Sequence, residues 1–320
     1  MIDNKFVLKK CLGQGGSSKV YLAKDESGQH VAIKILRKDK KYGYKRGSTM
    51  IQKEHAIMTK LESHPNILNS FYSNPDGQLK SASKKEDVLY NVIELAENGP
   101  VSSFVRITGS IEEDLVRFMF LQLSNAVHFM HSKRLAHLDL KLENILLDKY
   151  FNIKLADLGV AYQLERGSTS CSYRRGTVHY MAPEISNLQK EEKYDALKAD
   201  IYSLGVWLYL LLVGEFPSMA MINKFSLMST TDSVSDEGSE EEPSKDEYST
   251  NNWKLLSENA RNLIVQMLAL EPQHRPSINE VMNHPWFDHP LTEETQCTLY
   301  SEMTYRKSFI STFYRNKDKS

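Results

Sequence analysis

Cysteine is scarce in this sequence, with only Cys11, Cys171 and Cys297 among 320 residues. Such spacing forms neither a disulfide framework nor a zinc-binding pattern, and it suits a reducing compartment. We expect no signal peptide, because the N-terminal segment contains no long apolar core. The longest apolar run, residues 206–213, is far too short to cross a bilayer. These absences predict an intracellular, cytoplasmic protein without a membrane anchor, and they leave a nuclear location open.

An excess of charge of either sign is also missing. The formal net charge is −1 and the sequence pI is about 6.8, which excludes bulk electrostatic attraction to nucleic acid or to an acidic membrane. The fractions of apolar residues, 41%, and charged residues, 25%, are ordinary for a chain that buries a hydrophobic core. The length predicts roughly two domains, or one large domain with two lobes.

The pattern of apolar residues changes along the chain, from alternation to helical spacing. Strands are predicted at residues 5–36 (three strands), 67–73 and 87–95. The last two are expected to be joined by a polar loop at 74–86. Helices are predicted at residues 48–63, 111–131, 200–213 and 256–270. The chain is therefore expected to have a small strand-rich half followed by a larger helical half.

One stretch departs from globular composition. Eight of the sixteen residues from Asp232 to Glu247 are acidic, with serines and one proline between them. Such a stretch cannot bury enough apolar surface to order itself, so we expect a solvated loop at 230–247. A docking site for a basic partner is the alternative interpretation.

A glycine-rich segment, LGQGGSSKV (12–20), connects two predicted strands. Gly13 and Gly15 allow the backbone to approach phosphate oxygens closely, although a short glycine run is also common in ordinary turns. A dinucleotide fingerprint is poorly supported, because Ser18 replaces its third glycine and a strand-like segment follows. Lys34 ends the strand VAIK (31–34), where a lysine is unfavourable unless it meets an anion. Each feature alone is weak evidence for a phosphate site.

Six motifs together give a stronger signal, because they occur in the order of the protein-kinase signature set. They are GxGxxSxV (13–20), VAIK (31–34), Glu54 in a predicted helix, HLDLKLEN (137–144), DLG (157–159) and APE (182–184). The chain therefore resembles a eukaryotic protein kinase of the serine/threonine type over residues 6–288. Its HPWF ending (284–287) is similar to that of the calcium/calmodulin-dependent and related kinases.

The resemblance implies an α+β, two-lobed protein kinase fold. The small, β-rich N-lobe with one main helix would cover about residues 6–94. The larger, mostly helical C-lobe would cover about residues 97–288, and residues 289–320 would form a C-terminal tail. Within the C-lobe, Asp200 would anchor the catalytic loop, and Glu184 would form a buried ion pair with Arg275.

The resemblance also assigns catalytic roles. Lys34 would hold the α- and β-phosphates of ATP and pair with Glu54. Asp139 would orient the substrate hydroxyl and accept its proton. Lys141 would neutralise charge on the transferred phosphoryl group, and its place in DLKxEN is typical of kinases that act on serine and threonine. The resemblance also places Asn144 among the catalytic residues.

Metal and nucleotide contacts follow in the same way. Asn144 and Asp157 would bind Mg²⁺. The expected contacts to ATP come from the glycine-rich loop, the apolar walls around adenine and the hinge between the lobes. Besides Lys34 and Asp157, they are Leu12, Gly13, Gln14, Gly15, Gly16, Val20, Ala32, Glu94, Ala96 and Leu146. The expected partners are protein substrates with serine or threonine, without nucleic acid or membrane, and we expect a monomer.

One departure from the family pattern concerns regulation. Leu138 replaces the arginine that usually precedes the catalytic aspartate and binds a phosphate on the activation loop. The two other basic positions of that pocket align with Met50 and Tyr162, and the phosphorylated position aligns with Tyr173. The pattern predicts that the loop at 164–176 becomes ordered without a phosphate.

Two alternatives remain open at this level. Arg174 and Arg175 could hold a loop phosphate in a different geometry. The chain could also be a catalytically inactive pseudokinase that serves as a scaffold. Only Ser18 and Leu138 favour that second interpretation, and neither replaces a group that would touch metal or the transferred phosphoryl group.

The tail beyond the resemblance, residues 291–320, is basic and aromatic. Tyr305, Phe309 and Phe313 are spaced by four residues. The basic residues nearby are Arg306, Lys307, Arg315, Lys317 and Lys319. Such a helix could be the target of a regulatory partner such as a calcium sensor, an autoinhibitory segment, or a helix that packs on the C-lobe.

Overall fold

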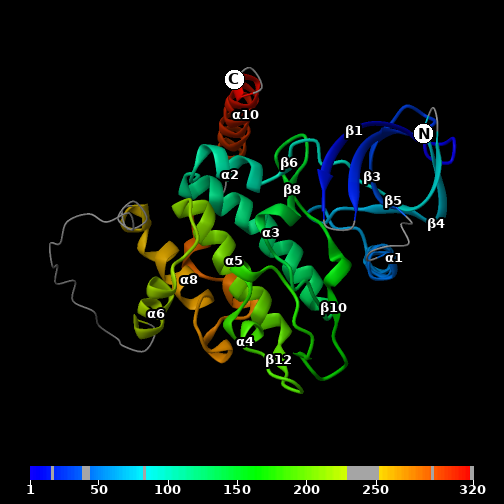
Figure 1. Ribbon diagram of the computed structural model, residues 1–320. Coiled ribbons are helices and arrows are strands. Elements are labelled where there is room, and N and C mark those ends of the chain that lie inside the picture. Colours follow the sequence, from blue (N-terminus) through cyan, green and yellow to red (C-terminus); the bar gives the residue numbers. More distant parts are fainter. Residues whose placement is uncertain (16–17, 38–43, 82–83, 229–251, 290–291, 318–320) are drawn as a thin grey trace.

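We describe the fold from a computed structural model of the chain. The structure describes residues 1–15, 18–37, 44–81, 84–228, 252–289 and 292–317. The predicted acidic loop at 230–247 and Gly16 therefore lie outside the described residues. A strand-rich N-terminal half stands beside a larger helical half (Figure 1), which confirms the expected α+β architecture.

The N-terminal half is built on one antiparallel sheet with the strand order β1-β2-β3-β5-β4. Its strands are β1 (Val7–Gln14), β2 (Lys19–Lys24), β3 (His30–Arg37), β4 (Ser70–Lys80) and β5 (Lys85–Ile93). The helix α1 (Tyr44–Lys60) contacts β3, β4 and β5. The three strands predicted before this helix are confirmed, while the helix begins and ends a few residues earlier than predicted.

The polar loop predicted at 74–86 is wrong for most of its length, because β4 and β5 extend across it as a hairpin. The N-terminal residues explain the difference. The Asp3 carboxylate accepts hydrogen bonds from the Gln78 backbone N–H at 2.7 Å, the Asn74 side chain at 2.7 Å and the Tyr90 hydroxyl at 2.8 Å. These polar groups are satisfied by a distant part of the chain, so the hairpin can be polar and still be ordered.

The C-terminal half is mainly helical. Its helices are α2 (Ser102–Thr108), α3 (Glu113–Ser132), α4 (Pro183–Ser186), α5 (Ala196–Val213), α6 (Met219–Met228), α8 (Glu258–Met267), α9 (Ile278–Met282) and α10 (Glu293–Lys317). The long helices predicted from the sequence correspond to α1, α3, α5 and α8. Helix α5 passes through the centre of this half, and α3 and α8 contact it.

In the part of the chain that the structure describes, the C-terminal half also contains three small sheets of short strands. They are β6 (Gly99–Pro100) with β8 (Ile145–Leu147) and β9 (Ile153–Leu155), β7 (Leu135–Ala136) with β10 (Tyr162–Gln163), and β11 (Ser170–Cys171) with β12 (Tyr194–Asp195). The strands β8 and β9, which follow the HLDLKLEN motif, pair with one another in antiparallel fashion. These short ladders fix the loops between them without long elements.

Helix α5 is the core of the C-terminal half. Its start is capped by Asp195, whose Oδ1 accepts hydrogen bonds from the backbone N–H groups of Leu197 and Lys198. Gly205 lets α8 approach closely, because a Cβ at this position would lie 2.9 Å from the Met267 side chain. The helix is long and apolar enough to span a bilayer, but 89% of its residues are buried inside the structure, as expected for a core helix.

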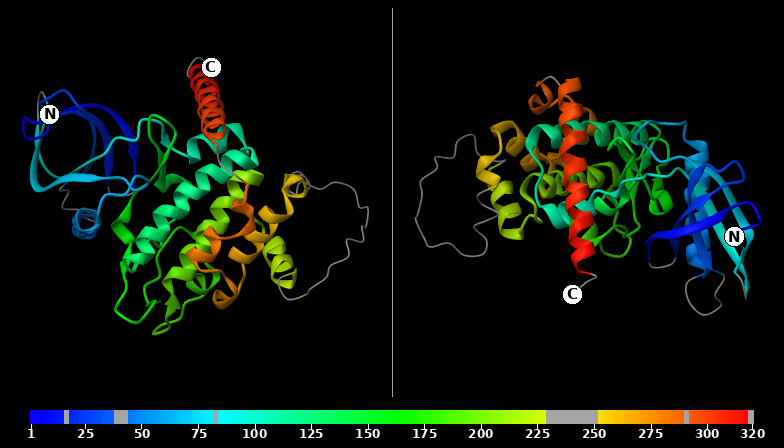
Figure 2. Two further views of the ribbon diagram at one scale, coloured as in Figure 1. Left: turned by 180° about the vertical axis from the view of Figure 1, so that it is seen from behind. Right: turned by 90° about the horizontal axis from the view of Figure 1, so that it is seen from above.

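The tail forms α10, which projects from the C-terminal half and contacts α2 and α3 (Figures 1 and 2). Leu299 and Met303 are buried against the core. Arg306 donates hydrogen bonds to the Thr108 hydroxyl at 2.7 Å and to the Ser110 carbonyl at 2.9 Å. Lys307 donates to the Asn98 side chain at 2.6 Å. The described part of the tail is thus a helix packed on the C-lobe, which was one of the three alternatives.

Candidate active site

A buried lysine joins the two halves of the molecule. The Lys34 ammonium on β3 lies 2.7 Å from Glu54 Oε2 on α1 and 3.1 Å from Asp157 Oδ1, just after β9. Burial alone would lower the pKa of Lys34, but the two carboxylates raise it above its ordinary value. Burial also opposes the charge of Asp157, yet the Lys34 ammonium lowers the pKa of this carboxyl. Both groups are therefore charged at neutral pH.

The catalytic-loop motif HLDLKLEN lies between β7 and β8 and is held from below by Asp200 on α5. The Asp200 carboxylate accepts hydrogen bonds from the backbone N–H groups of His137 and Leu138, both at 2.8 Å, and its Oδ2 lies 2.9 Å from His131 Nε2. Asp200 is buried, with an exposed fraction of 1%. The predicted anchor is thus confirmed, and the core helix sets the path of the loop.

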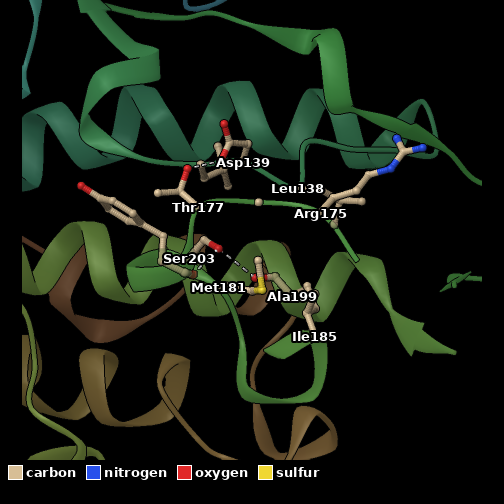
Figure 3. Close-up of a pocket in the computed structure, with 11 residues that line it drawn as sticks. Leu138, Asp139, Arg175, Thr177, Met181, Ile185, Ala199 and Ser203 are labelled. Atoms are coloured by element: carbon tan, nitrogen blue, oxygen red, sulfur yellow. Dashed lines mark hydrogen bonds between the residues drawn. The ribbon is translucent and has the colours of Figure 1, made fainter. Parts of the chain in front are cut away.

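Three polar side chains converge on the Asp139 carboxylate. Its Oδ1 accepts a hydrogen bond from the Thr177 hydroxyl at 2.7 Å, and its Oδ2 lies 2.7 Å from the Lys141 ammonium. Lys141 also donates to the Thr177 hydroxyl at 2.8 Å. Asn144 donates to Oδ2 at 3.0 Å. Asp139 and Thr177 lie side by side in the lining of the small cavity shown in Figure 3.

The donors predicted to hold Mg²⁺ flank two paired strands, with Asn144 directly before β8 and Asp157 two residues after β9. The Ala156 N–H donates to the Asn144 carbonyl at 2.8 Å, which places Asn144 close to Asp157. The amide nitrogen of Asn144 is used by Asp139, so its amide oxygen is the atom left for a metal. The carboxylate of Asp157 is 43% exposed. Two hard oxygen donors fit Mg²⁺, which usually takes its remaining ligands from water and phosphates.

No larger metal centre is formed by the described residues, which contain no group of three or more His, Cys, Asp and Glu side chains able to hold an ion.

The apolar residues predicted around adenine belong to one cluster that crosses the two halves. Ala32 is buried in it, and Val20, Ala96 and Leu146 pack against it. Ala32 pairs with Ile93 across β3 and β5. Leu12, Gly13 and Gln14 end β1 and Gly15 follows it, and all four are exposed.

Glu94, predicted in the hinge, has its side chain engaged elsewhere. The carboxylate accepts hydrogen bonds from the Asn69 backbone at 3.1 Å and side chain at 2.8 Å, and it lies 2.5 Å from the Lys154 ammonium. Its backbone N–H donates to the Asn69 carbonyl at 2.9 Å. Glu94 can therefore contribute to a nucleotide site only through its carbonyl oxygen.

The predicted buried ion pair is present. Arg275 donates to both carboxylate oxygens of Glu184, at 2.7 and 2.8 Å, and its side chain is buried. Three further hydrogen bonds of this guanidinium, to the Ala269, Lys198 and Leu270 carbonyls, satisfy its remaining polar hydrogens. This pair ties the APE segment to the base of the C-lobe.

The three positions that the resemblance aligned with phosphate-binding basic residues, Met50, Leu138 and Tyr162, carry no charge, but the site is not wholly apolar, because Arg175 lies in it. Leu138 is buried, with an exposed fraction of 5%, and Met50 lies against Gly159. The ring centroids of Tyr162 and Tyr173 are 5.8 Å apart. The guanidinium group of Arg175 lies over both rings. The loss of the basic positions thus leaves a packed site.

Sequence reasoning missed several contacts that hold the activation segment. Lys53 on α1 donates to the Ala161 carbonyl at 2.5 Å. Arg134 donates to the Ser168 carbonyl at 2.9 Å, and the Thr169 hydroxyl donates to Asp195 at 2.6 Å. The only sequence signal for Lys53 was its place beside Glu54, and a lysine on a helix surface is too common to be informative.

Comparison with known proteins agrees with the geometry of the site. Residues 6–287 match the model of the family described as protein kinase domain. This confirms the resemblance to eukaryotic kinases and the two-lobed fold that it implied.

The curated relatives include plant and yeast kinases. CBL-interacting protein kinase 2 of Oryza sativa subsp. japonica is 33% identical over 90% of this chain and 59% of its own length. CBL-interacting serine/threonine-protein kinase 26 of Arabidopsis thaliana is 35% identical over 88% of this chain and 58% of its length. Cell cycle serine/threonine-protein kinase CDC5/MSD2 of Saccharomyces cerevisiae is 31% identical over 91% of this chain and 38% of its length. The chain thus spans about three fifths of the plant relatives and less of the yeast one.

Proposed function

The chain belongs to the protein kinase family, alongside serine/threonine kinases, and from this premise we propose that it transfers the γ-phosphoryl group of Mg-ATP to serine and threonine hydroxyls of proteins. The observation that carries the proposal is the convergence on Asp139. The Thr177 hydroxyl lies between a carboxylate oxygen of Asp139 and the Lys141 ammonium, within 2.8 Å of each. An aliphatic hydroxyl in that position is what a substrate serine or threonine would also present.

Each residue then has a distinct task. Asp139 orients the substrate hydroxyl and accepts its proton, which is productive only if the carboxylate is fixed within hydrogen-bond reach. Lys141 lies beside Asp139 and stabilises negative charge on the phosphoryl group during transfer. Lys34 binds the α- and β-phosphates, and its pairing with Glu54 keeps it extended toward them.

Metal and nucleotide are held by the remaining residues. Asn144 and Asp157 would hold Mg²⁺, which when bound neutralises charge on the β- and γ-phosphates. The apolar cluster around Ala32 and Leu146 accepts adenine, and the hinge backbone at Glu94 and Ala96 orients it. Leu12 and the glycine-rich loop cover the phosphates from above.

The activation loop at 164–176 is proposed to need no phosphate for activity. The buried Leu138 cannot bind a phosphate, because it is apolar and offers no donor. The loop is tied to the C-lobe by contacts that involve no phosphate. The Tyr194 hydroxyl donates a hydrogen bond to the Tyr173 carbonyl at 2.9 Å, and the Thr169 hydroxyl donates to the Asp195 carboxylate at 2.6 Å. A ladder between β11 and β12 adds to these contacts. A loop held in this way needs no phosphate as a link.

The test is transfer of phosphate from radiolabelled ATP with Mg²⁺ to a generic protein substrate. Replacing Asp139→Asn removes the proton acceptor while keeping the size of the side chain, and is expected to lower kcat by roughly 10²- to 10⁴-fold. Asp288→Asn makes the same chemical change at an exposed position and should leave kcat unchanged. If the folded wild-type protein transfers no phosphate, the proposal is wrong and an inactive scaffold is favoured.

A regulatory partner on α10 is a further part of the proposal. Tyr305, Phe309 and Phe313 are 67%, 49% and 46% exposed and repeat every four residues, so they line one side of the helix. Two of the relatives are named as kinases that interact with another protein, CBL. Replacing the three aromatic residues by serine should abolish binding to an immobilised calcium sensor such as calmodulin, and equal binding by the variant would rule out this face.

A further inference from the structure

The side chain of Arg175 bridges the two ends of the activation segment. Its Nη1 donates a hydrogen bond to the Val160 carbonyl at 2.7 Å. Its guanidinium carbon lies 4.8 Å from the centre of the Tyr173 ring and 5.8 Å from the centre of the Tyr162 ring. We call residues 160–177, which include the loop at 164–176, the activation segment. Val160 and Tyr162 lie at its start and Tyr173 lies near its end, so one guanidinium contacts both ends.

We infer that Arg175 is a positioning residue that orders the activation segment by holding its two ends together. It thereby replaces the contact between a loop phosphate and the arginine that usually stands at position 138. A planar guanidinium suits this task, because it can donate hydrogen bonds in its plane while its faces lie over aromatic rings. No phosphate is needed, since the partners are a backbone carbonyl and two phenol rings. The inference rests on the proposed kinase activity for its kinetic test.

Arg175 is connected to the proton acceptor through the next two residues. Gly176 has a φ of 112°, and a Cβ there would lie only 2.9 Å from the Leu138 carbonyl oxygen, so the backbone presses against the catalytic loop. Thr177 follows and donates to Asp139. Figure 3 shows Arg175 and Leu138 beside one another, with Thr177 reaching toward Asp139. Displacement of Arg175 would therefore move Thr177.

The opposite end of the bridge reaches α1. Arg175 binds the carbonyl of Val160, and Lys53 binds the carbonyl of the next residue, Ala161. Burial and the nearby Arg175 lower the pKa of Lys53, which agrees with two cations meeting at this short stretch. Lys53 directly precedes Glu54 on α1. The carbonyls of Val160 and Ala161 therefore connect Arg175, near the end of the activation segment, with the helix that carries the Lys34–Glu54 pair.

The kinetic test compares Arg175→Ala with Arg174→Ala. The neighbour Arg174 is exposed, so its replacement makes the same charge change one residue away from the bridge. We expect Arg175→Ala to lower kcat for a protein substrate by roughly ten- to a hundredfold, with the KM for ATP unchanged because the hinge lies elsewhere. Arg174→Ala should keep the wild-type kcat. Equal kcat in wild type and Arg175→Ala, or equal losses in both variants, would overturn the inference.

Substitutions of Tyr173 separate positioning from a general loss of folding. Tyr173 is 52% exposed, so its replacement leaves the core intact. Tyr173→Phe keeps the ring under the guanidinium and should retain activity, whereas Tyr173→Leu should lose it in part. Arg175→Lys keeps the charge without the planar group and is expected to fall between wild type and Arg175→Ala.

Hydrogen exchange gives a readout that needs no catalysis. Amides of residues 160–173 should exchange faster in Arg175→Ala than in wild type or Arg174→Ala. If the wild-type protein proves inactive but this difference is present, the proposed function fails and the bridge stands. If the wild type is active and exchange is the same in all three proteins, the bridge fails and the proposed function stands.

Discussion

The Asp200 carboxylate accepts the backbone N–H of Leu138 at 2.8 Å and holds this leucine at a φ of 61°. A left-handed conformation costs a residue with a side chain on the order of 1–3 kcal/mol, so it persists only where the surroundings enforce it. The hydrogen bonds from Asp200 supply that constraint. They point the next residue, Asp139, toward Thr177, so the direction of the proton acceptor is set by the core helix.

Replacing Asp200→Asn should therefore lower kcat without removing any group that touches substrate. One of the two backbone N–H groups would face the amide nitrogen of the new side chain and lose its acceptor, at a cost of about 1–3 kcal/mol. We expect a loss in kcat of roughly tenfold or more, measured by steady-state phosphate transfer. Asp288→Asn is the matched control, and a wild-type kcat in Asp200→Asn would show that the loop does not depend on this anchor.

Removing the hydroxyls of the activation loop should leave activity within a few-fold. The change combines Ser168→Ala, Ser170→Ala, Ser172→Ala and Tyr173→Phe, because none of these replacements removes an apolar or ring contact. Thr169 is tested separately, as Thr169→Val, because its hydroxyl is bonded to Asp195. Mass spectrometry of the wild-type protein would confirm whether the loop carries phosphate. A hundredfold loss in the fourfold variant, with the protein folded, would show that loop phosphorylation is required.

Breaking the Glu184–Arg275 pair from one side should destabilise the protein strongly. Arg275→Met leaves a partly buried carboxylate without its partner, which costs about 3–5 kcal/mol in the free energy of unfolding. Urea unfolding followed by fluorescence measures this loss. Adding Glu184→Gln to Arg275→Met should restore only part of it, because the Ala269 and Leu270 carbonyls still lack a donor.

The control for this pair is Arg166→Met, which removes an exposed arginine. Its free energy of unfolding should stay within about 0.5 kcal/mol of the wild type. A similarly small effect for Arg275→Met would mean that the ion pair contributes little to stability.

The Lys34–Asp157 pair predicts how stability depends on pH. The pKa of Asp157 is lowered in the folded protein, so its contribution is fully present above the ordinary value of 3.8 and is lost as the pH falls through the lower, folded value. The pKa of Lys34 is raised, so its contribution is fully present below 10.5 and is lost only at more alkaline pH. Lys34 and Asp157 should therefore both be charged across the neutral range.

Urea unfolding of wild type and Asp157→Asn at a series of pH values tests this. The difference in their free energies of unfolding should shrink as the pH falls below the ordinary pKa of an aspartate, because Asp157 then becomes protonated. Burial and the neighbouring Asp157 raise the pKa of Glu54, so protonation of Glu54 adds a second change at a higher pH. Asp288→Asn, at an exposed position, serves as the control. A difference that does not shrink at acid pH would contradict the charged pair.

The fold and the chemistry of the site were largely predictable because they lie in short, contiguous motifs. Lys34, Asp139 and Asn144 could be recognised from their neighbours, and the predicted strand and helix pattern follows from local periodicity. The buried pair of Glu184 and Arg275 was predictable only through the family resemblance, since 91 residues separate its members.

The contacts that escaped prediction are long-range and involve common residue types. Lys53 reaches the Ala161 carbonyl across 108 residues, and any exposed lysine would look the same in the sequence. Arg175 was considered only as a phosphate ligand, whereas its partners are a carbonyl and two rings. Asp3 turns a polar hairpin into ordered strands, and periodicity has no access to such a partner 71 to 87 residues away.

The Asp3 contacts also bear on how fragments of this protein should be chosen. A fragment cut at the limits of the family match, residues 6–287, would discard Ile2, which is fully buried, together with the acceptor of the Tyr90 hydroxyl. It would open a hole at the edge of the β4–β5 hairpin and leave a buried phenol unpaired. Loss of activity in such a fragment would report damage to the N-lobe, and it should not be taken as evidence that α10 activates the enzyme.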